Sequence, residues 1–243
     1  MKVVALYKWA RDPEAATVRA GGVVDWGNAK MVAGDDDHAV IEVAKTLAEG
    51  GELVGLTLGD GDAAWAVARG VDVAYSVADA PYLADEATTA AIMAAAVKHI
   101  GGVDVVVIGD AEQQHPAVPG LLAGLLGWPA LSAVGSASAD GAKVTVERKV
   151  VGNIQTVSAG TPVVLGVAAA GEEAKPPGMM QMLQARKKPV TTLSLADLGV
   201  AADQGVTSAG TALPELEGAK MLEGSPAEVA AALVAALRSD GVL

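Results

Sequence analysis

Short β-branched runs alternate with alanine-rich segments over the first 126 residues, and this alternation limits the possible folds more than any other feature. The run over residues 103–108 is continuously apolar after its Asp104, rather than alternating polar with apolar. A continuous run of this kind suits a parallel strand that is buried on both faces. The pattern therefore predicts an α/β fold with a doubly wound, mostly parallel sheet and right-handed crossovers.

The expected strands cover residues 3–7, 53–58, 73–77, 103–108 and 162–167, and the expected helices cover residues 37–49, 63–69, 85–99 and 118–126. Two alternating segments, 143–149 and 153–158, predict a β-hairpin. Residues 168–189 are rich in Glu, Lys, Pro, Gly and Met and are interpreted as an extended arm. Ser225 and Pro226 are expected to begin a final helix, whose apolar face covers either the chain's own core or a partner.

Ligands of doubly wound sheets bind beyond the carboxyl ends of the strands. The candidate rims are therefore residues 7–13, 58–62 and 109–120. His115 lies in the third rim and has the best case for a functional role among the three histidines. The aspartates at 35–37 are interpreted as a solvated helix cap rather than as a cation site.

Composition excludes several kinds of chemistry. The 243 residues carry a formal net charge of −12, which disfavours nucleic acid and anionic membrane surfaces as partners. Cysteine is absent, so disulfides, thiolate metal sites and cysteine nucleophiles are excluded. No serine-triad order, zinc-binding helix, phosphate loop or G-x-G-x-x-G turn occurs. The sequence therefore offers no catalytic cluster of its own.

The chain is expected to be cytoplasmic and without direct membrane insertion. Its first apolar run is broken by Lys8 and Arg11, unlike the core of a signal peptide. No apolar stretch reaches the roughly 18 residues that a membrane span needs.

Several short motifs follow one another in a characteristic order along residues 1–200. They are KVVALYK at 2–8, ARGVD at 68–72, DVVVIG at 104–109, LLGWP at 125–129, QARKKP at 184–189 and LADLGV at 195–200. In this order they resemble the electron transfer flavoprotein beta subunit. Each motif is weak alone, whereas the collinear set is specific.

The resemblance implies an adenine-nucleotide-hydrolase-like α/β fold that pairs with an alpha subunit and passes electrons from a flavin dehydrogenase to an acceptor. FAD would be held mainly by the alpha subunit, and the beta subunit would hold AMP or a second FAD. The cofactor-binding positions that it implies are Leu6, Ala33, Leu58, Gly59, Gly109, Asp110, Val118, Pro119 and Gly120.

The resemblance also implies three parts: a nucleotide-binding-like domain over 1–170, a partner recognition loop over 171–189 and an extension over 190–243 that packs on the alpha subunit. The docking residues would be Met179, Met180 and Met182, because flexible thioethers suit an adaptable contact surface.

This sequence departs from the family pattern at the expected nucleotide loop. Ala117 stands where the family has Gln, and Pro119 removes one backbone N–H donor. Ala33, Gly34 and Asp35 stand in place of the family's Asn-Pro-Phe. Whether the site holds AMP, a second FAD or nothing is therefore open. The alternative function is a stand-alone adenine-nucleotide-binding module, sensing or structural, on the same fold.

Overall fold

The computed structural model describes residues 1–34, 36–59, 62–81, 84–110, 115–168, 177–188, 190–202, 205–215 and 218–243. Asp35, much of the 109–120 rim and most of the arm before Pro177 lie outside the described residues. The chain divides into two compact units. Unit 1 comprises Met1–Thr17 and Trp26–Ala209, and unit 2 comprises Val18–Asp25 and Gly210–Leu243.

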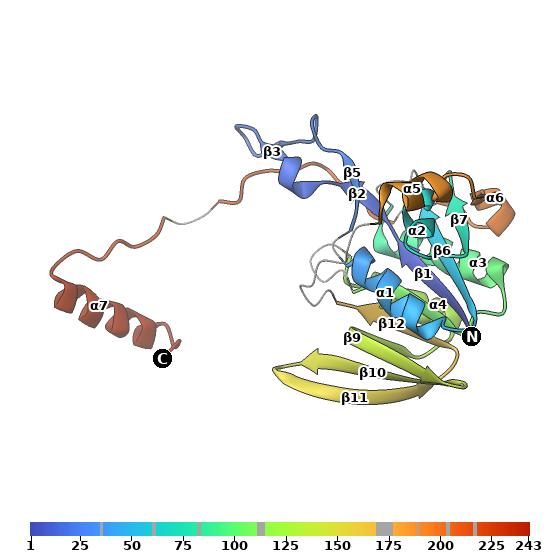
Figure 1. Cartoon of the computed structure of the whole chain (residues 1–243). Coiled ribbons are helices and arrows are strands. Elements are labelled where there is room, and N and C mark those ends of the chain that lie inside the picture. The colour runs from blue at the N-terminus through green and yellow to red at the C-terminus, as the bar shows by residue number, and fades with distance from the viewer. Residues whose placement is uncertain are drawn as a thin grey trace. The chain divides into compact units, whose positions relative to one another are not determined.

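Unit 1 is built on a nine-stranded sheet with the order β11-β10-β9-β12-β8-β1-β6-β7-β13 (Figure 1). The strands are β1 (Lys2–Tyr7), β6 (Glu52–Leu58), β7 (Val73–Val77), β8 (Val105–Gly109), β9 (Ala130–Asp140), β10 (Lys143–Val150), β11 (Asn153–Gly160), β12 (Val163–Val167) and β13 (Val190–Leu193). The pairings from β9 to β13 are parallel, and β10 and β11 continue the sheet as an antiparallel hairpin. The predicted doubly wound α/β class is confirmed.

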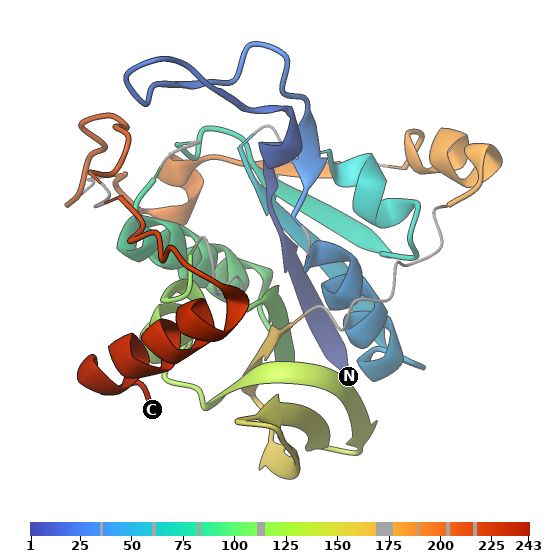
Figure 2. The same cartoon turned by 90° about the vertical axis from the view of Figure 1, so that its left-hand side faces the viewer.

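Helices cover both faces of this sheet. The residues of β1 alternate between the faces: Val3 and Tyr7 pack with α1 (Asp37–Leu47) and α2 (Ala63–Val67). On the opposite face, Val4 packs with α3 (Glu86–Ile100) and α4 (Val118–Leu126), which contact each other (Figure 2). Valine, leucine, isoleucine and alanine fill both layers, as a chain without phenylalanine requires.

The direction of winding reverses at β1. The chain proceeds from β1 to β6 and β7 on one side, and β8 then pairs with the other side of β1. Because ligands of such sheets bind at a reversal of this kind, the carboxyl ends of β1 and β8 are the expected binding edge.

A short antiparallel ribbon extends from that edge. It pairs β2 (Trp9–Arg11) with β5 (Met31–Ala33), and Trp9 lies opposite Ala33. The turn η1 (Pro13–Ala15) follows β2, and β3 (Thr17–Val18) pairs with β4 (Val24–Asp25).

The expectation of an extended arm is wrong for residues 179–185, which form the helix α5 (Met179–Ala185). Met182 and Ala185 are three positions apart and so share one helical face, which packs with Ala63 and Val67 of α2. Two further elements follow that the sequence pattern did not predict: β13, which pairs with β7, and α6 (Leu195–Leu198).

Unit 2 contains the final helix, α7 (Pro226–Ser239), which begins where it was predicted. Ser225 and Glu228 form a capping box at its start. No side chain of α7 is buried, and Leu233 is 48% exposed. In the described part of the chain, no helix is long and apolar enough to cross a membrane.

Candidate cofactor and docking site

The carboxyl ends of β1, β6 and β8 bring most of the predicted cofactor positions to one edge of the sheet. Leu6 and Leu58 are buried in the core on the α3 and α4 face, so their backbone rather than their side chains can reach a ligand. Gly59 follows β6 with a φ of +63° and donates its N–H to the carbonyl of Val77. Its backbone donor is therefore already used within the sheet.

Gly109, at the end of β8, accommodates a neighbouring side chain. A Cβ at this position would lie 2.9 Å from the Cβ of Asp36. The close approach that glycine permits here is thus made by the chain itself, just before α1.

Asp110 is buried and ties the end of β8 to β9. Its Oδ2 accepts a hydrogen bond of 2.8 Å from the N–H of Ala133, and the N–H of Asp110 donates to the carbonyl of Val167 in β12. The carboxylate therefore has a structural partner at the site where a cofactor contact was predicted.

Asp37 holds the start of α1 against the end of β1. Its Oδ2 accepts from the N–H of Lys8 at 3.1 Å and from the N–H of Gly34 at 2.8 Å. Asp37 is buried, so these bonds offset the cost of placing a carboxylate in the interior. The predicted position Ala33 lies next to this turn, in the ribbon that β5 forms with β2.

The start of α4 contains the predicted cofactor positions Val118, Pro119 and Gly120, and most of the described backbone donors there are engaged. The N–H of Ala117 donates to Oε1 of Glu86 at 2.9 Å, and the N–H of Val118 donates to the carbonyl of His115 at 3.2 Å. Pro119 has no N–H. Of the predicted positions at this helix start, Gly120 alone has a backbone donor without a partner among the described residues.

Lys8 and His115 share this edge with Glu86. Burial lowers the pKa of Lys8, and no carboxylate in the described chain pairs with its ammonium group. Burial also lowers the pKa of His115, the charge of Lys8 lowers it further, and Glu86 opposes both effects. These three groups lie close enough to influence one another.

On the α1 and α2 face, four buried polar atoms have no hydrogen-bond partner among the described residues: Tyr7 Oη, Trp9 Nε1, His38 Nδ1 and Thr57 Oγ1. Tyr7 pairs in register with Thr57, and its ring centroid lies 5.3 Å from that of Trp65. Burial and the carboxylates of Asp62 and Asp37 raise the pKa of Tyr7. Buried polar groups are normally hydrogen-bonded, so four such atoms in one corner are exceptional within the described part of the chain.

Sequence reasoning missed Glu86 and Asp37 as members of this edge. Both stand in the first turn of a helix, where a carboxylate favourably complements the helix dipole. Nothing in the local pattern shows that each side chain also reaches the backbone of another segment.

The predicted docking methionines lie on α5. Met179 and Met180 are 81% and 69% exposed, whereas Met182 is partly buried against α2. Two of the three predicted side chains therefore present apolar surface outward.

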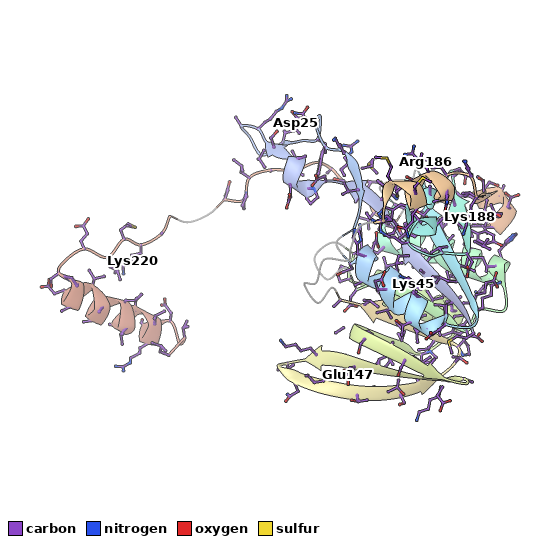
Figure 3. The ribbon with its side chains drawn as sticks, viewed as in Figure 1. Asp25, Lys45, Glu147, Arg186, Lys188 and Lys220 are labelled. Atoms are coloured by element: carbon purple, nitrogen blue, oxygen red, sulfur yellow. The ribbon has the colours of Figure 1, made fainter. Side chains whose placement is uncertain are left out.

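A groove of about 700 Å³ runs beside α5. Lys45 of α1 and Lys188, both marked in Figure 3, line it together with Arg69 and Glu42. The Arg69 guanidinium lies 4.1 Å from the centroid of the Trp65 ring and donates to the carbonyl of Trp65. The groove thus carries three cationic side chains and one carboxylate in a chain that is acidic as a whole.

Comparison with known proteins gives one consistent relationship. The family described as "Electron transfer flavoprotein domain" matches residues 23–198. The chain is 32% identical over 150 residues to "Electron transfer flavoprotein subunit beta" of Mycobacterium tuberculosis (strain ATCC 25618 / H37Rv), a match that covers 60% of this chain and 56% of that protein. The matched part thus spans just over half the length of the mycobacterial relative.

The protein of the same name from Bacillus subtilis (strain 168) is 27% identical over 257 residues, covering 99% of this chain and 98% of the relative. The family match covers most of the chain and includes β6 and β8, whereas β1 precedes the matched residues. The chain therefore belongs to the electron transfer flavoprotein domain family.

Proposed function

We propose that the chain is the beta subunit of a heterodimeric electron transfer flavoprotein and completes an FAD site together with an alpha subunit. The observation that carries this proposal is the match to the Bacillus subtilis protein over nearly the whole length of both chains. The absence of cysteine, and of any catalytic cluster recognised in the sequence, is compatible with this role.

FAD, when bound, supplies the electron transfer chemistry. The residues of this chain would form one side of the FAD site and determine the charge there. The β2–β5 ribbon, with Trp9 and Ala33, would face the cofactor beyond the carboxyl end of β1. The Lys8 ammonium would lie nearby as a positive charge without a carboxylate partner in the described chain. A half-buried cation of this kind would favour a flavin that gains negative charge on reduction.

The exposed methionines of α5 support a second part of the proposal, in which a flavin dehydrogenase docks on Met179 and Met180. Adaptable thioethers suit a surface that must accept a partner and release it. The uncovered apolar face of α7 supports a third part, in which the 190–243 extension packs on the alpha subunit. We place the complex in the cytoplasm, which cell fractionation tests.

Co-expression with an alpha subunit tests the main proposal. A yellow heterodimer with one flavin absorbance spectrum and a single peak in size-exclusion chromatography is expected. A colourless chain that stays monomeric, ignores the alpha subunit and binds AMP tightly would instead support the stand-alone nucleotide-binding module.

Docking is tested separately by the Met180→Asp variant of the heterodimer. The rate at which a dehydrogenase reduces the flavin should fall by roughly tenfold or more, equivalent to about 1.4 kcal/mol of lost interaction. Ile154→Asp is the matched control, because Ile154 is also an exposed apolar residue but lies on β11. Equal rates for both variants would contradict docking on α5.

A further inference from the structure

We propose that the start of α5 is a modification site, at which a hydroperoxide oxidises the thioethers of Met179 and Met180 to sulfoxides and thereby interrupts docking of the electron donor. The inference rests on the proposed docking of a flavin dehydrogenase on these two side chains. It adds that oxidation controls this docking, while the heterodimer and its flavin stay intact.

The methionines of this chain differ in how far a dissolved oxidant can reach them. Of the seven, Met179, Met180 and Met221 are exposed, with 81%, 69% and 80% of their surface accessible. Met93 is 4% exposed in the core, and Met182 is partly buried against α2. Two of the three exposed thioethers thus lie next to each other at the proposed docking surface. The chain has no cysteine that would react in their place.

The modification transfers one oxygen atom to sulfur. The thioether sulfur attacks one oxygen of hydrogen peroxide, the O–O bond breaks, an S–O bond forms, and water is released. Sulfur gives up two electrons and the peroxide accepts the same two, so no further co-reactant is needed. The product is a polar, chiral side chain in place of a flexible apolar one.

A sulfoxide at this position opposes docking because it must lose its hydration. An apolar partner surface that covers Met179 or Met180 would offer no donor to the S–O oxygen, and a buried polar group without a partner costs free energy. The unmodified thioether is apolar and adaptable, so it carries no such cost. Oxidation therefore weakens the encounter without changing the formal charge of α5.

The fold of α5 does not depend on the exposed thioethers. The helix packs on α2 through Met182 and Ala185. At its start, the N–H of Gly178 donates to Oε1 of Gln181 at 2.8 Å, and the carbonyl of Gly178 accepts the N–H of Met182 at 3.1 Å. These contacts involve neither of the oxidised side chains, so the modification changes the surface of α5 and leaves the helix in place. The same exposure admits a methionine sulfoxide reductase, which makes the change reversible.

Peptide mass spectrometry of the purified heterodimer tests the modification itself. After brief treatment with hydrogen peroxide, Met179 and Met180 should each gain one oxygen atom before Met93 and Met182 do. The flavin absorbance and the elution volume in size-exclusion chromatography should stay as they were before treatment. Oxidation of the buried methionines at the same rate, or loss of the flavin, would overturn the inference.

Stopped-flow kinetics test the effect on docking, with the peroxide removed before the flavin dehydrogenase of the docking test is added. The rate of flavin reduction should fall roughly tenfold or more after treatment, equivalent to about 1.4 kcal/mol, and methionine sulfoxide reductase should restore it. In Met179→Leu/Met180→Leu, the ratio of the treated to the untreated rate should be close to one, because leucine has no sulfur. Met221→Leu is the matched control, which removes the other exposed thioether and should lose as much rate on treatment as the unmodified protein.

The outcomes separate this inference from the proposed function. An unchanged rate although both sulfoxides have formed would overturn the inference, as would an equal loss in the double leucine variant and the unmodified protein. In either case Met180→Asp still decides whether docking takes place on α5. A heterodimer without FAD, or one that the dehydrogenase does not reduce before treatment, would contradict the proposed function and the inference with it.

Discussion

Gly166 and Asp110 fit together only because Gly166 has no side chain. A Cβ on Gly166 of β12 would lie 2.6 Å from Oδ1 of Asp110, which follows β8. The other carboxylate oxygen accepts the N–H of Ala133 in β9. One buried carboxylate thereby joins three neighbouring strands at the edge where β8 and β12 end.

Gly166→Ala is therefore expected to destabilise unit 1 by about 1–3 kcal/mol, the usual cost of overfilling a tightly packed interior. Thermal unfolding followed by circular dichroism measures this loss. Gly160→Ala serves as the control, because a Cβ there meets no heavy atom within 4 Å. Equal melting temperatures for the two variants would show that Asp110 moves aside without cost.

Asp110→Ala is expected to cost about 1–3 kcal/mol, because it leaves the N–H of Ala133 without its acceptor. Asp110→Asn keeps an oxygen acceptor at this position and should lose less. Denaturant titration of the three proteins should rank the midpoints in the order Asp, Asn, Ala. An asparagine midpoint equal to or below the alanine midpoint would contradict the role of Asp110 as a hydrogen-bond acceptor.

Trp65 links the core to the groove beside α5. It belongs to α2 and is buried in the core that α2 shares with α1, and its ring contacts Tyr7, His38 and Arg69. Trp65→Ala should cost about 3–5 kcal/mol through the cavity that it leaves. Arg69→Gln should cost about 1 kcal/mol or less, because it removes a cation from one ring face and leaves the core filled. Chemical denaturation measures the stability loss of each variant. Similar losses for Trp65→Ala and Arg69→Gln would contradict the expectation that core filling contributes more than the cation on the ring.

Two histidines make stability depend on pH. Burial lowers the pKa of His38 and of His115 below the ordinary value of 6.5, and the charges of Arg69 and Lys8 respectively lower them further. The folded protein thus binds fewer protons than the unfolded chain, so stability falls as the pH decreases through this range. The melting temperature should be lower at pH 5.5 than at pH 7.5.

The variant His38→Gln/His115→Gln tests the assignment, since it should flatten this dependence, whereas His99→Gln should preserve it. Hydrogen bonds also lower the pKa of Asp85 and Asp197, but carboxylates of this kind lose their contribution only as the pH falls toward and below their ordinary value of 3.8. If the melting temperature of the double variant changed between pH 5.5 and pH 7.5 as much as that of the unmodified protein, groups other than these histidines would cause the effect.

Deletion of residues 225–243 should leave the melting temperature of the isolated chain unchanged. The deletion removes α7, and none of its side chains is buried. In the presence of the alpha subunit, the same deletion should weaken heterodimer formation, which analytical ultracentrifugation measures. A lower melting temperature of the chain alone would mean that α7 covers the chain's own core.

The regular elements of unit 1 could be predicted where local pattern and burial agree. The runs at β1 and β8 are apolar because both faces of these central strands are covered. Their continuous apolar composition therefore indicates that they lie in the middle of the sheet. In contrast, the pattern of β9 shows no strong alternation, because most of its residues remain partly or fully exposed. Its place in the sheet follows from pairing with β10 and β12, which a local window does not contain.

The candidate edge could be located from the strand order, but its internal hydrogen bonds could not. Gly109 was expected to allow a ligand to approach the backbone, whereas the nearest group is the side chain of Asp36. Likewise, Glu86 fits a helix start by every local criterion, and its bond to Ala117 depends on how α3 and α4 lie against each other. Residue types and strand order thus predicted where the candidate edge lies, whereas tertiary packing determines which side chains occupy its backbone donors.

The position of α5 between β12 and β13 has a consequence for binding kinetics. Its flanking strands are far apart in one sheet, with β8, β1, β6 and β7 between them, so the segment is anchored at both ends to a rigid base. Under the proposed docking, a partner that meets Met179 and Met180 would not have to immobilise a free chain end, so a smaller entropy loss would accompany each encounter. Association would then be limited mainly by diffusion and orientation rather than by the ordering of this segment.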